Sequence, residues 1–124
     1  MILVAGPYRS GTNDNPKLIG ANIQAMTEAA LEIYKIGHLP VLGEWFALPL
    51  IEAAGSKKIG DVIFNEIFHP VAMQLIDHCD AVLRIGGASA GADEMVNKGR
   101  SKNKIFFHSI KEIPIVTRDK LHSI

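Results

Sequence analysis

A chain of 124 residues is long enough to bury one hydrophobic core, and we expect a single domain over residues 1–124. Hydrophobic residues make up 48% of the chain and charged residues 21%, which excludes an intrinsically disordered protein. Thirteen basic residues balance thirteen acidic ones, so we expect no nucleic-acid partner bound through its phosphate backbone.

Short apolar runs mark the expected strands. Residues 1–6, MILVAG, form a continuous apolar run that is typical of a strand buried on both faces. Similar runs follow at residues 39–43, 81–86 and 104–109, and Ile115–Val116 could add a fifth strand. Because the runs at 1–6 and 81–86 are both continuous and apolar, we expect them to be adjacent central strands.

Helical patterns fill most of the segments between these runs. Asn15 and Pro16 can cap and open a helix that Gly37 ends, and apolar residues recur between them at helical spacing. Further helices are expected from Pro70 to about Cys79 and from about Ala92 to Arg100.

The alternation of strands and helices predicts an α/β fold. Residues 44–61, which Gly55 and Gly60 interrupt, are interpreted as a loop with a short helical piece. Parallel strands joined through helices need right-handed crossovers and carry helices on both faces of the sheet. We therefore predict a flavodoxin-like three-layer sandwich with a parallel sheet of about five strands, and ligands in such sheets bind at the carboxyl ends of the strands.

The loops after the first and third strands are rich in glycine and hydroxyl residues, and both lie at the predicted carboxyl edge. Glycine allows a backbone to approach a ligand closely, and free amides at a helix start favour an anion. An arginine in the first loop suits a phosphate or carboxylate, although it could equally be a solvated surface residue. The candidate binding residues in these loops are Gly6, Tyr8, Arg9, Ser10, Gly11, Gly87, Ser89 and Gly91.

Three acidic residues and one tryptophan are further candidates. Asp93 and Glu94 stand where a helix starts, and the helix dipole stabilises a carboxylate there by roughly 0.3–1 kcal/mol. Such a carboxylate can act as a nucleophile or bind sugar hydroxyls, but acids are also common in first turns because of the dipole alone. Glu44 and Trp45 follow the second strand and should reach the same edge, where the indole could stack on a base or instead pack against another subunit.

Other features of the chain argue against several partners and compartments. The histidines show no metal-ligand spacing with one another or with carboxylates, so we expect no metal site and no cofactor. No apolar run is long enough to span a bilayer and no signal peptide is recognisable, so we expect no membrane partner. The single cysteine, Cys79, can form no internal disulfide, which favours a cytoplasmic location.

Four segments, ILVAGPYRSG, GHLPVLGE, LIDHCDAVLRIGG and SAGADEMV, together resemble the nucleoside 2-deoxyribosyltransferase-like superfamily. That group includes the deoxynucleoside 5'-monophosphate N-glycosidases. The resemblance extends from the first strand to the fourth and depends on the order and spacing of short motifs. It implies a five-stranded parallel sheet, a homodimer or larger homo-oligomer, and a glutamate nucleophile that attacks the anomeric carbon of the sugar and displaces the base.

The resemblance implies roles for particular residues. Glu94 matches the nucleophile. The segment GPYRSG resembles the G-S-x-R-G-G loop of the monophosphate hydrolases, which implies that Arg9, Ser10 and Gly11 lie near a 5'-phosphate, with Ser89 on the opposite loop.

This chain departs from its relatives at two points. Relatives usually place the glutamate six residues after the loop serine, whereas Glu94 follows Ser89 by five, so Met95 could be the equivalent position. Ala72 stands where many relatives carry an aspartate that helps to protonate or orient the leaving base. His69, three residues earlier, could donate a proton at the same place or could simply cap a helix.

The leading hypothesis is N-glycosidic bond cleavage or transfer on a (deoxy)nucleoside or nucleoside 5'-monophosphate through a covalent glycosyl-Glu94 intermediate. The alternative is a non-catalytic nucleotide- or nucleotide-sugar-binding module, which Ala72 favours and Glu94 opposes. A phosphoribohydrolase of the P-G-G-x-G-T-x-x-E type is a third hypothesis. The absent proline and the extra residue between Gly87 and Glu94 weaken it.

Overall fold

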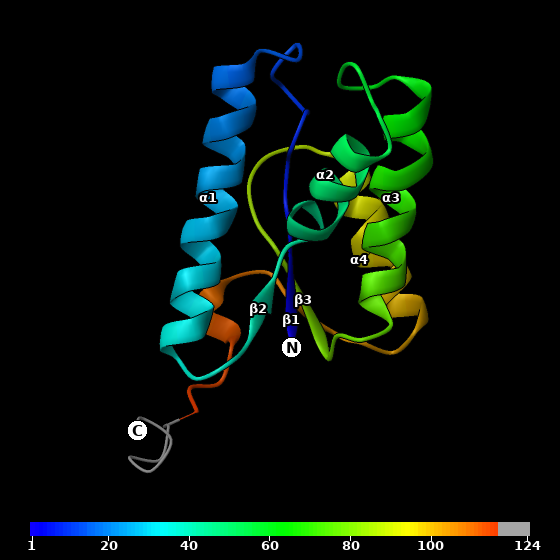
Figure 1. Ribbon diagram of the computed structural model, residues 1–124. Helices are drawn as coiled ribbons and strands as arrows, with labels where there is room; N and C mark the ends of the chain where they lie inside the picture. Colours follow the sequence, from blue (N-terminus) through cyan, green and yellow to red (C-terminus); the bar gives the residue numbers. More distant parts are fainter. Residues whose placement is uncertain (117–124) are drawn as a thin grey trace, which may run out of the picture.

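A four-stranded parallel sheet lies at the centre of the computed structural model, which describes residues 1–116 (Figure 1). Its strands are β1 (Ile2–Ala5), β2 (Pro40–Val41), β3 (Ala81–Arg84) and β4 (Ile105–Phe107). They lie in the order β2-β1-β3-β4, and every pair is parallel. This order matches the first four positions of the flavodoxin-like order 2-1-3-4-5, and it confirms that the apolar runs at 1–6 and 81–86 form adjacent central strands.

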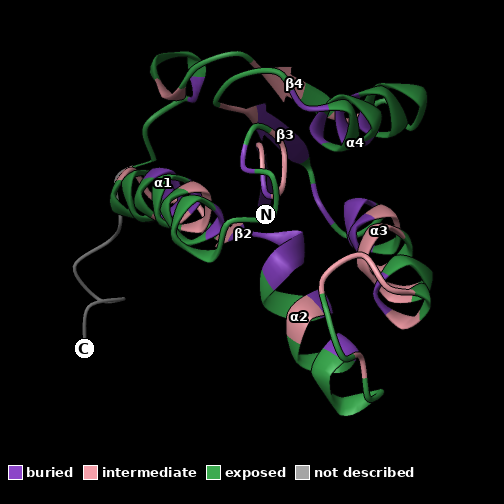
Figure 2. Cartoon of the chain, turned by 90° about the horizontal axis from the view of Figure 1, so that it is seen from above, coloured by how far each residue is buried: buried purple, intermediate pink, exposed green. Residues whose placement is uncertain are grey.

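Helices cover both faces of the sheet (Figure 2). On one face, α1 (Pro16–Lys35) and the short 3₁₀ helix η1 (Ile110–Glu112) pack against Ile2 and Val4 of β1. On the other, α3 (Val62–Ile76) and α4 (Ala90–Ser101) pack against Leu3 and Ala5. Successive side chains of a strand point to opposite faces, so a strand between two helical layers must be apolar throughout. The predicted α/β architecture with helices on both faces is therefore confirmed.

The capping residues of α1 act as the sequence predicts. The Asn15 side chain accepts a hydrogen bond from Lys17 N at 2.9 Å, and Pro16 occupies the first turn, where its missing N–H costs nothing. Gly37 follows the helix with φ +103°, a conformation that residues with a Cβ rarely adopt.

The middle of the chain contains more helix than predicted. The segment 44–61 was expected to be mainly loop, but α2 spans Gly43–Ala53. Its buried Ala47 and Ile51 join Phe64 of α3 in a separate apolar cluster. Packing against α3 therefore stabilises a helix that the local sequence pattern does not predict.

The start of α3 was also predicted wrongly. The helix begins at Val62 instead of Pro70, because the Asp61 side chain caps it by accepting a hydrogen bond from Phe64 N at 2.8 Å. Pro70 lies inside the helix with its ring exposed to solvent. Although proline removes one backbone hydrogen bond there, the packing of α3 on α2 and the sheet keeps the helix continuous.

The fifth strand expected at Ile115–Val116 is absent, and the sheet of the described residues has four strands instead of about five. Val116 N donates to Ile36 O at 2.8 Å, and His38 Nε2 lies 2.6 Å from Pro114 O. This segment therefore bonds to the end of α1 and not to β4. Among residues 1–116, no helix combines the length and apolar character that a membrane crossing requires.

Candidate active site

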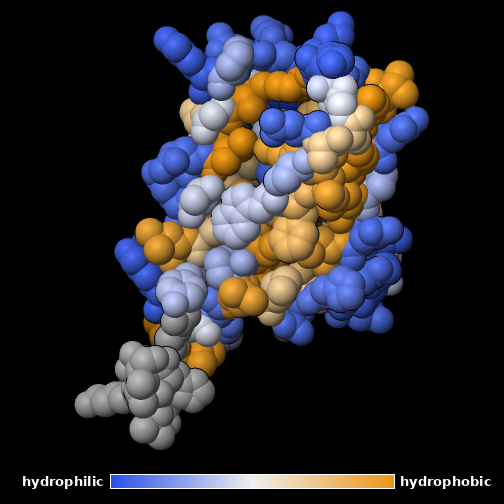
Figure 3. Space-filling model, viewed as in Figure 1, coloured by the Kyte–Doolittle hydropathy of each residue, from blue (hydrophilic) through white to orange (hydrophobic). Residues whose placement is uncertain are grey.

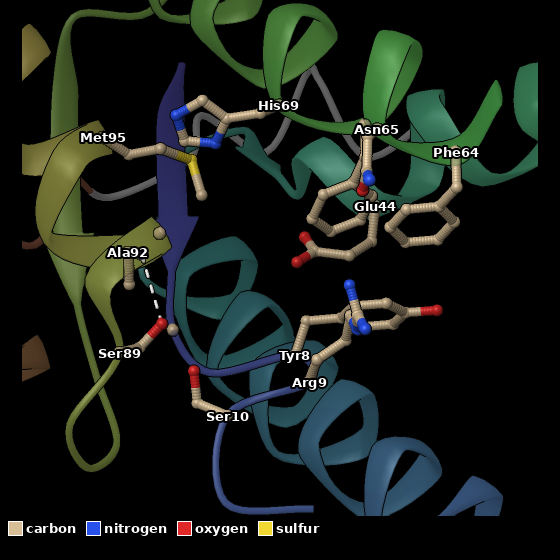
Figure 4. A pocket seen from close by; sticks show the side chains of 13 residues that line it. Tyr8, Arg9, Ser10, Glu44, Phe64, Asn65, His69, Ser89, Ala92 and Met95 are labelled. Carbon is tan, nitrogen blue, oxygen red and sulfur yellow. Dashed lines mark hydrogen bonds between the residues drawn. The ribbon is translucent and has the colours of Figure 1, made fainter. Parts of the chain in front are cut away.

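A cavity of about 270 Å³ opens at the carboxyl end of β1, beside the start of α4 (Figure 4). The loop after β1, the first turn of α2, the face of α3 and the first turn of α4 form its walls. The lining residues are Gly6, Tyr8, Arg9, Ser10, Glu44, Phe64, Asn65, Phe68, His69, Ser89, Gly91, Ala92 and Met95. The two glycine-rich loops therefore meet at one cavity, because parallel strands deliver their following loops to the same edge of the sheet.

Most of the predicted site residues line this cavity, and five do not. Those that line it are Gly6, Tyr8, Arg9, Ser10, Glu44, His69, Ser89 and Gly91. Those outside its lining are Gly11, Trp45, Gly87, Asp93 and Glu94. Trp45 lies on the outer side of α2 with 42% of its surface exposed, so its indole does not form a wall for a base.

An aromatic wall that sequence reasoning missed lies along α3. The Phe68 ring stacks on Tyr8 at 5.0 Å and on Phe64 at 4.9 Å between ring centroids. Asn65 lies beside them in the lining and donates to Gly60 O at 3.0 Å. The i, i+4 spacing of the two phenylalanines was the available signal. It was overlooked because residues 62–69 were not predicted to be helical.

Glu44 is the most unusual group in the cavity. It lies in the first turn of α2 and is only 3% exposed, and its Oε1 finds no hydrogen-bond partner among the described residues. Figure 4 shows its carboxylate pointing into the cavity between the serines and the aromatic side chains. Burial raises the pKa of Glu44 to about 7, and a hydrogen bond from its own backbone offsets this only in part.

The position of Glu44 follows from close packing between α2 and α3. Gly43 precedes it, and a Cβ atom at Gly43 would lie 3.0 Å from the Cβ of Ala72 on α3. Ala72 is 4% exposed and belongs to the core beneath α2. Small residues at both positions let the start of α2 lie directly against α3, which carries Glu44 into the cavity wall.

Arg9 is held by its own loop. Its Nε and Nη2 donate to the two carboxylate oxygens of Asp14 at 2.8 and 2.9 Å, and its guanidinium lies 5.6 Å from the centre of the Phe64 ring. The hydrogen bond to Asp14 raises the pKa of Arg9, and the same pair lowers the pKa of Asp14. Buried Thr12 fixes the turn, since its hydroxyl donates to Arg9 O at 2.5 Å and accepts from Asp14 N at 3.1 Å.

The neighbouring loop before α3 also approaches Arg9. A Cβ atom at Gly60 would lie 2.7 Å from Arg9 Nη2, and the φ of Gly60 is +83°. The positive φ favours glycine at this position, and the missing side chain leaves room for the Arg9 guanidinium. Nη1 makes no bond to Asp14, so part of the guanidinium remains available for an anionic ligand.

His69 and Glu94, both predicted from the sequence, are in direct contact. His69 Nε2 lies 2.7 Å from Glu94 Oε2, which joins α3 to α4 beside the cavity. The nitrogen is buried but not aligned for a hydrogen bond, and the Glu94 side chain is 62% exposed. Met95, the next residue, is buried and lines the cavity instead.

Asp93 lies outside the cavity and has a structural partner. Its carboxylate oxygen lies 3.2 Å from Nε of Arg84, which ends β3. The same guanidinium donates to Gly87 O at 2.8 Å and to Ile85 O. Arg84 therefore ties the glycine-rich loop and the first turn of α4 together, and Asp93 serves that connection.

The electrostatic environment of the cavity is set by few groups. Burial raises the pKa of the Tyr8 hydroxyl, and the nearby Glu44 raises it further. Ser89 caps α4, since its Oγ accepts from Ala92 N at 3.2 Å.

Within residues 1–116, no group of three or more His, Cys, Asp or Glu side chains is placed to hold a metal ion.

Comparisons with known proteins add no assignment. The chain matches no protein-family model, and neither curated proteins nor solved structures give a significant match.

Proposed function

We propose that the chain cleaves or transfers the N-glycosidic bond of a (deoxy)nucleoside or nucleoside 5'-monophosphate, with Glu94 as the nucleophile. The observation that carries this proposal is the convergence of both glycine-rich loops, Glu44 and His69 on one cavity at the carboxyl edge of a parallel sheet. The aromatic wall of Tyr8 and Phe68 offers a flat apolar surface for a base.

The contact between His69 and Glu94 supports a catalytic role for Glu94. Cleavage of an N-glycosidic bond develops positive charge at the anomeric carbon, which a carboxylate can stabilise and then capture covalently. Most of the Glu94 side chain is exposed, so a change of its rotamer would turn the carboxylate toward a ligand in the cavity. The imidazole would orient the nucleophile.

The alternative function, a non-catalytic nucleotide- or nucleotide-sugar-binding module, is favoured by Met95. Met95 is the sixth residue after Ser89, and the resembling enzymes carry their glutamate at this spacing. Its side chain, which cannot act as a nucleophile, lines the cavity. A module of this kind would bind ligand without releasing a base.

Incubation with a panel of deoxynucleosides and their 5'-monophosphates, followed by chromatography for free base, tests the proposal. We expect base release by the wild type, and a loss of several orders of magnitude for Glu94→Gln, which keeps the shape of the side chain but removes the nucleophilic oxygen. Asp93→Asn is the control, and its effect should be small because Asp93 pairs with Arg84 outside the cavity.

Two results would change the assignment. Ligand binding without base release from any member of the panel would favour the binding module. Loss of activity in Asp93→Asn but not in Glu94→Gln would transfer the nucleophilic role to Asp93.

We also propose a homo-oligomeric assembly of flavodoxin-like domains in the cytoplasm. Support for assembly comes from α2, whose outer side exposes Trp45, Phe46 and Leu50 at 42%, 50% and 52%. Figure 3 shows hydrophobic side chains gathered on the face where α2 lies. Clusters of exposed apolar side chains are typical of protein interfaces.

A further inference from the structure

We propose that Glu44 is the catalytic acid and base of this cavity, giving a proton to the departing base and later recovering one from the attacking water or acceptor. The inference rests on the proposed N-glycosidic activity and deepens it, since it assigns the proton transfer to a residue that the sequence analysis placed only among the binding groups.

The geometry of Glu44 carries the argument. The Glu44 carboxyl group is 3% exposed, and its Oε1 has no hydrogen-bond partner among the described residues. Buried polar groups are nearly always hydrogen-bonded, so an unpartnered oxygen here lowers the stability of the fold. Its oxygens point into the cavity (Figure 4), so a ligand in that cavity would supply the missing hydrogen bond. Among residues 1–116 it is the one carboxylate in the cavity lining.

The other ionisable groups around the cavity are less suited to this proton transfer. From the loop after β1, Arg9 is paired with Asp14, and the raised pKa of Tyr8 keeps its hydroxyl protonated. From α3, His69 has its Nε2 against Glu94 of α4 and therefore faces the nucleophile. Among residues 1–116, the ionisable side chains in the cavity lining are Tyr8, Arg9, Glu44 and His69, and Asp14 and Glu94 contact two of them from outside it.

The protonation of Glu44 suits the task. Burial raises its pKa to about 7, so protonated and ionised forms coexist near neutral pH. A group with this property can both donate and accept a proton during one catalytic cycle. No acidic residue of α3 lines the cavity, and Glu44 of α2, whose neighbour Gly43 packs against Ala72, supplies a carboxyl group there.

The reaction balances with these two glutamates. As the Glu94 carboxylate forms a bond to the anomeric carbon, the carbon–nitrogen bond breaks, its electron pair stays on the base nitrogen, and Glu44 gives that base its proton. Water then attacks the anomeric carbon, its proton returns to ionised Glu44, and the carbon–oxygen bond to Glu94 breaks. The products are free base and free sugar, and an incoming base carrying an N–H would replace water in transfer.

The test compares Glu44→Gln with Glu52→Gln, an exposed glutamate on the same helix outside the cavity. Base release is measured from pH 5 to 9 on the nucleoside panel and on 7-methylguanine nucleosides, whose cationic base leaves without a proton. We expect wild-type kcat/KM on ordinary substrates to fall above about pH 7. Glu44→Gln should lose roughly 10²–10⁴-fold on these substrates but less than about tenfold on the methylated ones.

The outcomes separate the two proposals. If the wild type releases base but Glu44→Gln matches Glu52→Gln, or loses equally on ordinary and methylated substrates, the acid–base role is wrong and the proposed function stands. If the wild type releases no base from any substrate, the proposed function fails and this role fails with it. Circular dichroism melting of each variant confirms that the compared proteins are folded.

Discussion

At the scale of single residues, the burial of Glu44 links the site to stability. Its pKa is about 7 in the folded chain against 4.5 as an ordinary glutamate, so the folded state binds this proton more tightly than the unfolded state. Stability from this group is therefore full below pH 4.5 and is lost as the pH rises to about 7.

We predict that Glu44→Gln flattens the pH dependence of folding. The wild type should lose roughly 2–3 kcal/mol of unfolding free energy between pH 5 and pH 8 through this group, whereas the amide cannot ionise. Urea unfolding at the two pH values measures the difference, with Glu52→Gln as the control. An equal pH dependence in Glu44→Gln and the wild type would show that Glu44 is not titrating in this range.

Arg9 poses a different question, because Asp14 already occupies part of its guanidinium. If Arg9 binds a 5'-phosphate, Arg9→Ala should weaken monophosphate binding by about 1.5–3 kcal/mol, the strength of hydrogen bonds to a charged group. Nucleoside binding should change little. Isothermal titration of both ligands makes the comparison.

Asp14→Asn is the partner variant for this experiment. It removes the competing charge and keeps the side-chain shape, so monophosphate binding should strengthen. Equal losses for nucleoside and monophosphate in Arg9→Ala would mean that Arg9 supports the loop and does not bind phosphate.

At the scale of elements, the close contact between α2 and α3 excludes an acidic side chain at position 72. Ala72 is 4% exposed beneath Gly43, so an aspartate there would be buried without a partner. We predict that Ala72→Asp lowers the unfolding free energy by about 3–5 kcal/mol and gives no gain in base release. The exposed Ala25→Asp on α1 is the control and should cost less than about 1 kcal/mol. Denaturant unfolding at pH 7 measures both, and a stable, more active Ala72→Asp would contradict this account.

The start of α3 depends on one side chain. Asp61 accepts hydrogen bonds from Phe64 N, from Lys57 N and from the Ser56 hydroxyl, and the first of these contributes most to lowering its pKa to about 2. A lowered pKa means that this contribution to stability is present above about pH 4 and is lost as the pH falls toward 2.

We predict that Asp61→Ala lowers Tm by about 3–6 °C at pH 7, with a smaller loss for Asp61→Asn, which keeps an acceptor. Because α3 carries Phe68 and His69, ligand binding should weaken together with Tm. Differential scanning calorimetry at pH 7 and pH 2.5 provides the measurement, and the difference between wild type and Asp61→Ala should shrink at the lower pH. A constant difference would contradict the capping role.

At the scale of the whole molecule, the exposed apolar side of α2 bears on assembly. We predict that the chain sediments as a species of at least twice its 13.5 kDa mass. The double variant Phe46→Asp with Leu50→Asp should sediment as a monomer, since charged groups would be desolvated in the interface. Leu18→Asp, a change at a 49% exposed residue of α1, should leave the assembly intact. A monomeric wild type, or a double variant that still assembles, would exclude this interface.

Local sequence was enough to predict the central part of the fold. The continuous apolar runs of β1 and β3 predicted adjacent buried strands, and Asn15, Pro16 and Gly37 predicted the limits of α1, because caps and strand burial depend on neighbouring residues. The same reasoning placed Ser10, Ser89 and the other loop residues at one edge, since all parallel strands end there.

Only the tertiary structure decided the rest. Because α2 and α3 pack against each other, both helices are longer than the local sequence pattern predicts. The same contact buries Glu44, and the longer α3 stacks Phe64 on Phe68. The rotation of α4 directs Met95 into the cavity and leaves Glu94 against His69, a choice between adjacent residues that helical periodicity cannot make without the position of the neighbouring helix. The charges and the glycine-rich loops could be read from neighbouring residues. The desolvation of Glu44 and the contacts between side chains of different helices could not, because they depend on elements that are distant in the sequence.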